Sequence, residues 1–277
     1  MKRNIEKKVK GNKAIDGDNV HLVRVLSKRN YNDFDPILML DSFDSTNYED
    51  YKNGFPFHPH RGIETISYLS KGKMIHRDTL NNEEIIKDGE VQWMSTASGI
   101  MHEEKFPKSN RLLGVQLWLN IPKDNKMDHP SYLNIRDNEI KKIPISGGVL
   151  KLISGNYKDY SGYKSKYLPL DFYVINLEKN NKLILETKND QTVILFSLLG
   201  KIKISDEEVD EKTAVKLSNG DYFEIESLDE NIELLVLKTQ RLNEKIAWAG
   251  PIVMNNEKQI NEAFKELEEG TFLKNQN

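Results

Sequence analysis

Two short motifs of this chain carry residue types that can bind a metal ion: His58-Pro59-His60 and, further along, His102-Glu103-Glu104. In a β-strand, the side chains of residues i and i+2 point to the same face. On neighbouring strands, the first and third residues of both motifs could therefore reach one point in space. Three imidazoles and one carboxylate suit a divalent first-row metal such as iron, nickel, copper, zinc or manganese. The motifs predict a metal site in the first half of the chain, with coordination positions open for substrate or oxygen.

Pro59 lies between the two histidines of the first motif. Proline has no backbone N–H to donate to a sheet, so it is confined to edge strands, strand starts and bulges. We therefore expect this strand at the edge of its sheet or at a bulge, near the mouth of the barrel, which would leave the metal reachable from solvent.

The elements that must position these motifs read mainly as strands. Short runs rich in β-branched and aromatic residues alternate with turn residues, which is typical of a sandwich or jelly-roll barrel. The pattern occurs twice: an apolar strand ends at Gly72 and another at Gly200, and each is followed by a hairpin and a second Gly turn. We predict an all-β chain of two barrels, with domains 1–135 and 136–277. No histidine follows His129, so the second barrel cannot carry the same metal site.

The C-terminal region has a different period. Ile260, Ala263, Phe264 and Leu267 fall at i, i+3, i+4 and i+7, which places them on one face of a helix. Asn256 before this run and Gly270 after it are plausible ends of the helix. We expect this helix to pack on a barrel and to have no chemical role.

Composition and charge limit the function classes. The 277 residues include 38% hydrophobic residues, enough for a core, and the net charge of −3 gives no reason to expect nucleic acid as a partner. Cysteine is absent, which excludes disulfides and thiolate ligands and fits a cytoplasmic protein. The basic start of the chain lacks the apolar stretch of a secretion signal, and no run approaches the roughly 18 apolar residues that cross a membrane.

At these motifs the chain resembles the pirins, a branch of the cupin superfamily. Gly54–Thr65 (GFPFHPHRGIET) is similar to the first pirin motif, and Gly89–Met94 (GEVQWM) with Ser98–Glu104 (SGIMHEE) is similar to the second. Further similar signatures are His76-Arg77-Asp78, Gln116-Leu117-Trp118 and Gly250–Asn255 (GPIVMN). The resemblance runs from about residue 35 to about residue 270.

The resemblance implies two cupin barrels in one chain, a bicupin, with one mononuclear metal, usually Fe(2+), in the N-terminal barrel. It implies that the metal ligands are His58, His60, His102 and Glu104. For several family members it implies an oxidoreductase activity, the oxygen-dependent ring opening of quercetin (quercetin 2,3-dioxygenase, or quercetinase). Other members are described as regulators that bind transcription factors.

Several residues keep more than one interpretation. Glu64 is a rival carboxylate, because many cupins use a Glu four residues after the second motif histidine; we rank Glu104 first and treat Glu64 as a group that orients a ligand histidine. Either carboxylate could serve as the catalytic base. His76 fits a pocket wall and a structural hydrogen bond equally well. Gln92, Trp93 and Met94 are expected to form wall rather than to act in catalysis. His21 and His129 receive no role.

Two functional classes follow. The first is a metal-dependent dioxygenase that takes a flavonol or similar enol and O2 as substrates; a hydroxyl bound to the metal would lose its proton more easily. The second is a non-catalytic iron-binding regulator whose redox state alters a surface that binds a protein partner. A sugar isomerase-type cupin is a weaker third possibility. We expect a monomer with no membrane partner.

Overall fold

The computed structural model describes residues 1–274, and most of them lie in strands. The chain divides into two compact units. We call Lys13–Lys28, Ile37–Asp137 and residues 242–274 the first barrel, and Met1–Asn12, Arg29–Pro36 and Asn138–Arg241 the second barrel. The prediction of an all-β fold is therefore confirmed. None of the helices in the described part of the chain is long and apolar enough to cross a membrane.

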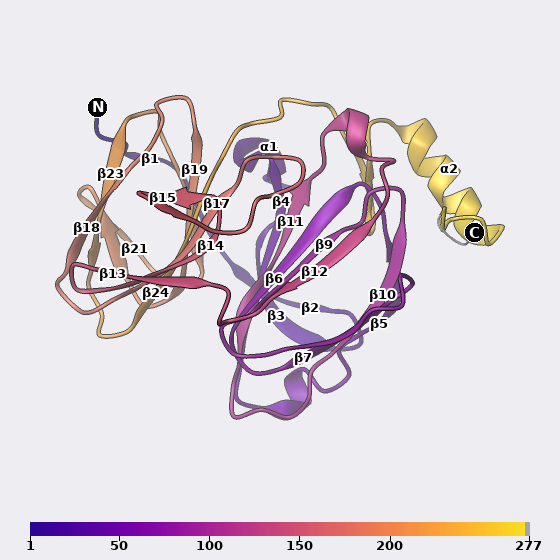
Figure 1. Ribbon diagram of the computed structural model, residues 1–277, viewed down its shortest axis with the longest axis horizontal. Helices are drawn as coiled ribbons and strands as arrows, with labels where there is room; N and C mark the ends of the chain where they lie inside the picture. Colours follow the sequence, from indigo (N-terminus) through magenta and orange to yellow (C-terminus); the bar gives the residue numbers. More distant parts are fainter. Residues whose placement is uncertain (275–277) are drawn as a thin grey trace. The chain divides into compact units, whose positions relative to one another are not determined.

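The first barrel has two main antiparallel sheets (Figure 1). The larger sheet holds, in order, β12 (Ser131–Ile135), β9 (Val91–Ser95), β6 (Ile63–Lys71), β11 (Leu112–Asn120), β4 (Ile37–Ser45), β3 (Val20–Leu26) and β2 (Asn12–Asp16). The smaller sheet holds β5 (Phe55–His60), β10 (Ile100–Lys105), β7 (Met74–Asp78) and β8 (Glu83–Ile86). The strand β5 contains Pro59 and lies at a sheet edge, as predicted.

The second barrel repeats this arrangement. Its larger sheet holds β1 (Ile5–Lys10), β22 (Thr213–Leu217), β19 (Thr192–Leu199), β24 (Ile232–Thr239), β17 (Asp171–Leu177), β14 (Gly148–Ser154) and β13 (Lys141–Ile145). Its smaller sheet holds β18 (Lys182–Glu186), β23 (Tyr222–Ser227), β20 (Ile202–Ile204) and β21 (Glu207–Val209). One continuous core of leucine, isoleucine, valine and aromatic side chains fills this barrel. The pair β15 (Asn156–Tyr157) and β16 (Tyr160–Ser161) forms a separate hairpin.

The remaining elements are short, apart from the C-terminal helix. They are α1 (Tyr31–Phe34), η1 (Tyr48–Asp50), η2 (Lys123–Asn125), the strand pair β25 (Ala247–Ala249) and β26 (Ile252–Met254), and α2 (Glu257–Glu268). The predicted helix and its ends are confirmed: Asn256 caps α2 by accepting a hydrogen bond from the Gln259 N–H, and Gly270 follows with a φ of 71°.

Both ends of the chain belong to units other than those that the linear division at 135/136 assigned. The N-terminal strand β1 pairs with β22 of the second barrel. Its sequence IEKKVK is mostly exposed, so it lacked the apolar pattern of a strand. The segment 242–274, including α2, belongs to the first barrel. There the Val253 N–H donates to the Arg61 carbonyl at 3.0 Å, and the buried Arg61 guanidinium contacts Glu266 of α2 at 2.7 Å.

Candidate metal centre

Strand pairing brings the two histidine motifs together. The strand β10 lies between β5 and β7, and His102 is directly opposite His58 on β5. A register shift follows between His102 and Glu104, so that Glu104 is opposite Phe55. Such a bulge bends a strand and re-aims its side chains. His102 and Glu104 are both 1% exposed and thus share the inner face of the sheet.

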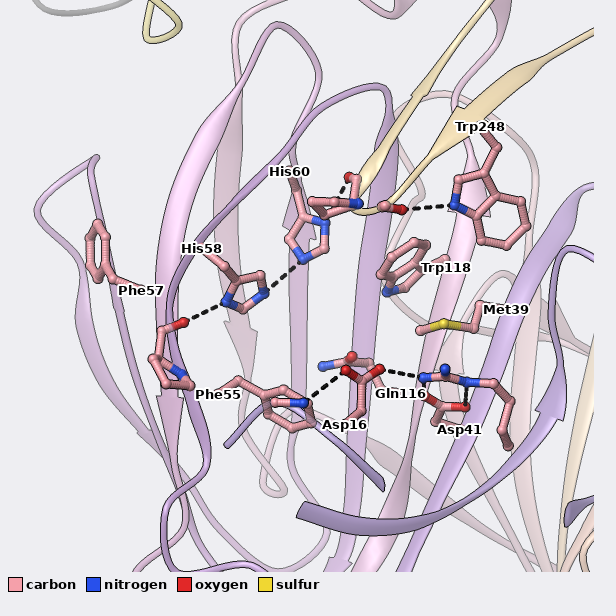
Figure 2. Close-up of a pocket in the computed structure, with 15 residues that line it drawn as sticks. Asp16, Met39, Asp41, Phe55, Phe57, His58, His60, Gln116, Trp118 and Trp248 are labelled. Carbon is pink, nitrogen blue, oxygen red and sulfur yellow. Dashed lines mark hydrogen bonds and ion pairs between the residues drawn. The ribbon is translucent and has the colours of Figure 1, made fainter. Parts of the chain in front are cut away.

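Three imidazoles form one cluster. His58, His60 and His102 each offer a ring nitrogen, and these three atoms lie within 4.8 Å of one another. The Nε2 atoms of His58 and His60 are 3.0 Å apart (Figure 2). The His102 ring centroid lies 4.4 Å from that of His58 and 5.2 Å from that of His60. The structure therefore brings three of the four predicted ligands into one group.

Backbone carbonyls determine which ring nitrogen of two histidines faces the cluster. His58 Nδ1 lies 2.8 Å from the Pro56 carbonyl, and His60 Nδ1 lies 3.0 Å from the Pro251 carbonyl. A carbonyl can only accept, so each Nδ1 carries the proton and each Nε2 presents a lone pair. Two lone pairs at 3.0 Å repel each other unless a proton or a metal cation lies between them. The donor atoms of this pair therefore fit a bound cation.

Burial supports the same assignment. Burial and the nearby His58 lower the pKa of His60 to about 3. Burial, followed by the neighbouring imidazoles, also holds the pKa of His102 well below its usual value. Metal binding requires unprotonated imidazoles. His102 Nε2 is in addition a buried atom with no hydrogen-bond partner among the residues that the structure describes. A buried acceptor without a partner costs folding free energy unless a ligand binds its lone pair.

Glu104 lies beside this cluster. With His76 and His102 it forms a second group whose ligand atoms lie within 4.8 Å of one another. Gln92 Nε2 donates to Glu104 Oε1 at 2.7 Å, and Gln116 Nε2 donates to Glu104 Oε2 at 2.9 Å. The two amides thus hold the buried carboxylate from both sides. Sequence reasoning assigned Gln92 to the wall, and its role as a donor to Glu104 was missed.

Glu64 and His76 occupy different surroundings. The Glu64 carboxylate accepts a hydrogen bond from the Trp93 indole at 3.0 Å, and Glu64 belongs to neither potential ligand group among residues 1–274. His76 is fully buried, donates from Nε2 to Asp78 Oδ2 at 2.9 Å and stacks on Tyr132 at 4.3 Å. Of the two interpretations of His76, the structure supports the hydrogen bond.

A cavity of about 510 Å³ opens beside His58 and His60 (Figure 2). Trp118, Trp248 and Met39 form an apolar wall. The Trp118 ring lies 5.0 Å from the His60 ring and 5.8 Å from the Trp248 ring. The C-terminal segment supplies Trp248, so it both lines the cavity and holds His60 through the Pro251 carbonyl. The resemblance flagged this segment as a signature, but its role became visible only in the structure.

A charged wall, formed by Asp16, Arg24 and Asp41, completes the cavity. Arg24 makes two hydrogen bonds to Asp41, at 3.0 and 2.7 Å, and a third to Asp16 at 2.6 Å (Figure 2). Burial raises the pKa of Asp41, whereas at Asp16 burial is outweighed by hydrogen bonds, which lower its pKa. With both carboxylates ionised beside one guanidinium, the wall has a net negative charge. Nothing in the sequence singled out these residues, since they lie on three separate strands and match no motif.

Known proteins match this chain over most of its length. The family model described as Pirin matches residues 19–119, and the one described as Pirin C-terminal cupin domain matches residues 172–273. A Thermoplasma acidophilum protein, provisionally named a quercetin 2,3-dioxygenase, is 39% identical over 257 residues, which are 85% of this chain and 98% of that protein. The pirin-like protein of Caulobacter vibrioides is 34% identical over 275 residues, 98% of this chain and 99% of that protein.

A solved structure extends the match to the whole fold. Quercetin 2,3-dioxygenase from Acinetobacter baumannii is similar with a TM-score of 0.89 and 30% identity, covering 98% of this chain and 99% of that one. Both cupin domains are thus matched in sequence and in structure. The chain belongs to the pirin family.

Proposed function

We propose that this protein is a metal-dependent dioxygenase that opens the ring of a flavonol such as quercetin, or of a similar enol, with O2. One observation carries the proposal: three imidazole nitrogens lie within 4.8 Å of one another at the wall of a cavity of about 510 Å³. The names of the similar proteins from Thermoplasma acidophilum and Acinetobacter baumannii support the reaction class.

The residues that would hold the metal are His58, His60, His102 and Glu104. Iron(II) is our first choice, and nickel, copper, zinc and manganese suit the same donors. A divalent ion bound there would act as a Lewis acid and lower the pKa of an enol or catechol hydroxyl. The carbonyls of Pro56 and Pro251 orient two of the imidazoles without adding charge.

The cavity walls would position the substrate. Trp118, Trp248 and Met39 offer apolar surface to a planar ring, and the charged wall of Asp16, Arg24 and Asp41 offers carboxylate oxygens to its hydroxyl groups. Glu104 is our first candidate for the base that takes the substrate proton, since its partner Gln116 lines the cavity. Glu64, held by Trp93, is the second candidate.

The decisive experiment measures oxygen consumption and the loss of the long-wavelength absorption of quercetin with metal-loaded protein under air. We expect both signals with iron and neither with a His102→Ala variant. A His21→Ala variant is the matched control, because His21 is half-exposed and pairs with Asp50 away from the cluster. If metal-replete protein changes neither oxygen nor quercetin with any of the five metals, the dioxygenase proposal is wrong. An iron-binding regulator, tested by partner affinity in the ferrous and ferric states, would then be the better explanation.

A further inference from the structure

The three imidazoles of the cluster are oriented by different kinds of partner. His58 and His60 donate to backbone carbonyls, which no substitution of a side chain can remove. His102 instead contacts a side chain: its Nδ1 lies 3.4 Å from Nδ1 of the buried His76. A contact between two imidazole nitrogens does not by itself determine which one carries the proton. The groups behind His76 must determine it.

Asp78 determines which ring nitrogen of His76 carries the proton. His76 Nε2 lies 2.9 Å from Asp78 Oδ2, and an ionised carboxylate can only accept. Hydrogen bonds from His76 and Asn82 outweigh the effect of burial and hold the pKa of Asp78 below its usual value. In its neutral form His76 therefore carries its proton on Nε2 and presents a lone pair at Nδ1. His102 must then donate from Nδ1, which leaves the lone pair of His102 Nε2 facing the cluster.

We infer that Asp78 and His76 are positioning residues that set the tautomer of His102 and so prepare His102 Nε2 to bind the metal. The inference rests on the proposed metal site and adds to it a carboxylate–imidazole–imidazole chain. Metal-binding histidines commonly donate their second ring N–H to a carboxylate or carbonyl, and loss of such a partner typically costs about 10–100-fold in metal affinity. Here the carboxylate acts through an intervening histidine, and Tyr132 stacks on that ring at 4.3 Å and 15°.

The hydrogen bonds of Asp78 make one substitution unusually informative. Asp78 Oδ1 accepts from the backbone N–H groups of Leu80 and Asn82, at 2.8 and 3.1 Å. The Asn82 side-chain amide donates to both carboxylate oxygens, at 3.1 Å to Oδ1 and 2.9 Å to Oδ2. In an Asp78→Asn variant the amide oxygen must stay at the Oδ1 position, because an NH2 group there would face two N–H donors. The new NH2 group therefore faces His76 Nε2, and the Asn82 side chain, whose NH2 group lies 2.9 Å from the Oδ2 position, must turn its amide oxygen toward it. This reverses both hydrogen bonds of the chain and puts a proton on His102 Nε2.

The first test uses metal-free protein and the long-range 1H–15N spectrum of its six histidines. In the unmodified protein we expect His102 protonated at Nδ1, and in Asp78→Asn we expect it protonated at Nε2. This readout needs neither metal nor activity. A wild-type His102 protonated at Nε2 overturns the inference.

The second test measures the dissociation constant for ferrous iron, with Ni(2+) as an air-stable probe. Asp78→Asn should weaken binding about 10–100-fold, and His76→Phe should weaken it less, because His102 is then free to adopt either tautomer. In the His76→Phe background, Asp78→Asn should have no further effect. An Asp78→Asn protein that is folded and binds metal normally, or an equal effect in both backgrounds, contradicts a role through His76. If the unmodified protein shows the expected tautomer but binds no metal, the proposed function fails while the hydrogen-bond direction stands.

Discussion

The strands β5 and β10 of the first barrel and the strands β18 and β23 of the second barrel occupy the same places in sheets of the same order. In the first barrel their inward positions hold His58, His60, His102 and Glu104. In the second barrel the corresponding strands place Leu183 opposite Ile225 and Leu185 opposite Phe223, and all four side chains are buried. The same arrangement of strands thus carries a cluster of potential metal ligands in the first barrel and an apolar core in the second.

The difference shows what buried imidazoles require of the surrounding chain. Leucine and phenylalanine need only close packing, whereas each buried ring nitrogen needs a partner. The first barrel supplies two of these partners from outside the two strands, the Pro251 carbonyl for His60 and His76 of β7 for His102. The partner of His58 is the Pro56 carbonyl of its own strand. The second barrel keeps a cavity of about 710 Å³, with Lys238 and Tyr173 in its wall, but no potential ligand group among residues 1–274 lies there.

The largest expected effect is a loss of stability caused by a core substitution in the second barrel. Phe223 is fully buried in its core, so Phe223→Ala should lower the free energy of unfolding by about 3–5 kcal/mol through lost burial and the cavity left behind. Metal content should stay unchanged, because the cluster lies in the other barrel. Urea unfolding and elemental analysis measure the two quantities. Loss of metal without unfolding would contradict the separation of roles.

Replacement of a metal ligand in the first barrel should instead reduce metal binding. His58→Ala, His60→Ala or His102→Ala should each weaken metal binding by roughly a hundredfold, or about 2.7 kcal/mol, since one donor is lost. Metal titration of each variant beside His21→Ala makes the comparison. Full metal content in the three variants would show that the cluster is not the metal site.

The sequence was sufficient for the parts of this comparison that depend on local pattern. The i, i+2 spacing of His58 and His60 placed both on one face, and Pro59 indicated an edge strand; both hold in the structure. The short runs rich in β-branched and aromatic residues predicted strands in both halves of the chain, and the structure has them. The helical period and caps of α2 were equally local.

The partners of the ligands could not be predicted, because they are distant in the chain or belong to the backbone. His60 and the Pro251 carbonyl are 191 residues apart, and a carbonyl acceptor leaves no trace in residue type. The Asp78–His76 pair was visible as a motif, but its direction depends on the hydrogen bonds that Leu80 and Asn82 donate. The charged wall joins residues from β2, β3 and β4, which pair only in the folded sheet.

The two carboxylates near the cluster should differ in their effect on metal binding. Glu104→Gln removes the negative charge next to His102, and we expect about a tenfold loss of metal affinity. Glu64→Gln alters a group held by the Trp93 indole outside both ligand groups, and we expect less than about a threefold loss. Isothermal titration with the same metal compares them. A larger loss from Glu64→Gln would make Glu64 the ligand.

In the metal-free protein, acid should destabilise the first barrel more than the second. The folded-state pKa of His60 is about 3, below the value of about 6.5 in an unfolded chain. The unfolded state therefore binds more protons between these values, and stability is lost as the pH falls from about 6.5 toward 3. We expect His60 alone to contribute a loss of about 1 kcal/mol per pH unit between pH 6 and 5, above the range in which ordinary carboxylates titrate. The buried His102, whose pKa is also lowered, adds to this loss.

Hydrogen exchange at pH 7 and pH 5 locates this loss. Strands β5 and β10 should lose protection, while β18 and β23, which contain no histidine, should keep theirs. Equal losses in both barrels would mean that groups other than the buried imidazoles cause the acid effect.

The smallest effect concerns the charged wall. The cavity of the second barrel is lined instead by two lysines and one glutamate, Lys158, Lys238 and Glu186. Asp16 lies partly in solvent, and together with Asp41 it outweighs the charge of Arg24. In metal-loaded protein the wall should disfavour a ligand that carries a carboxylate, so catechol should bind more tightly than 3,4-dihydroxybenzoate. Asp16→Asn should narrow that difference about threefold at low salt and less at high salt, because salt screens an exposed charge. The exposed neighbour Asp18, changed to Asn, is the matched control, since it does not line the cavity. If the affinity ratio of catechol to 3,4-dihydroxybenzoate is unchanged in Asp16→Asn, or changes equally in both variants, the wall does not discriminate between ligands by their charge.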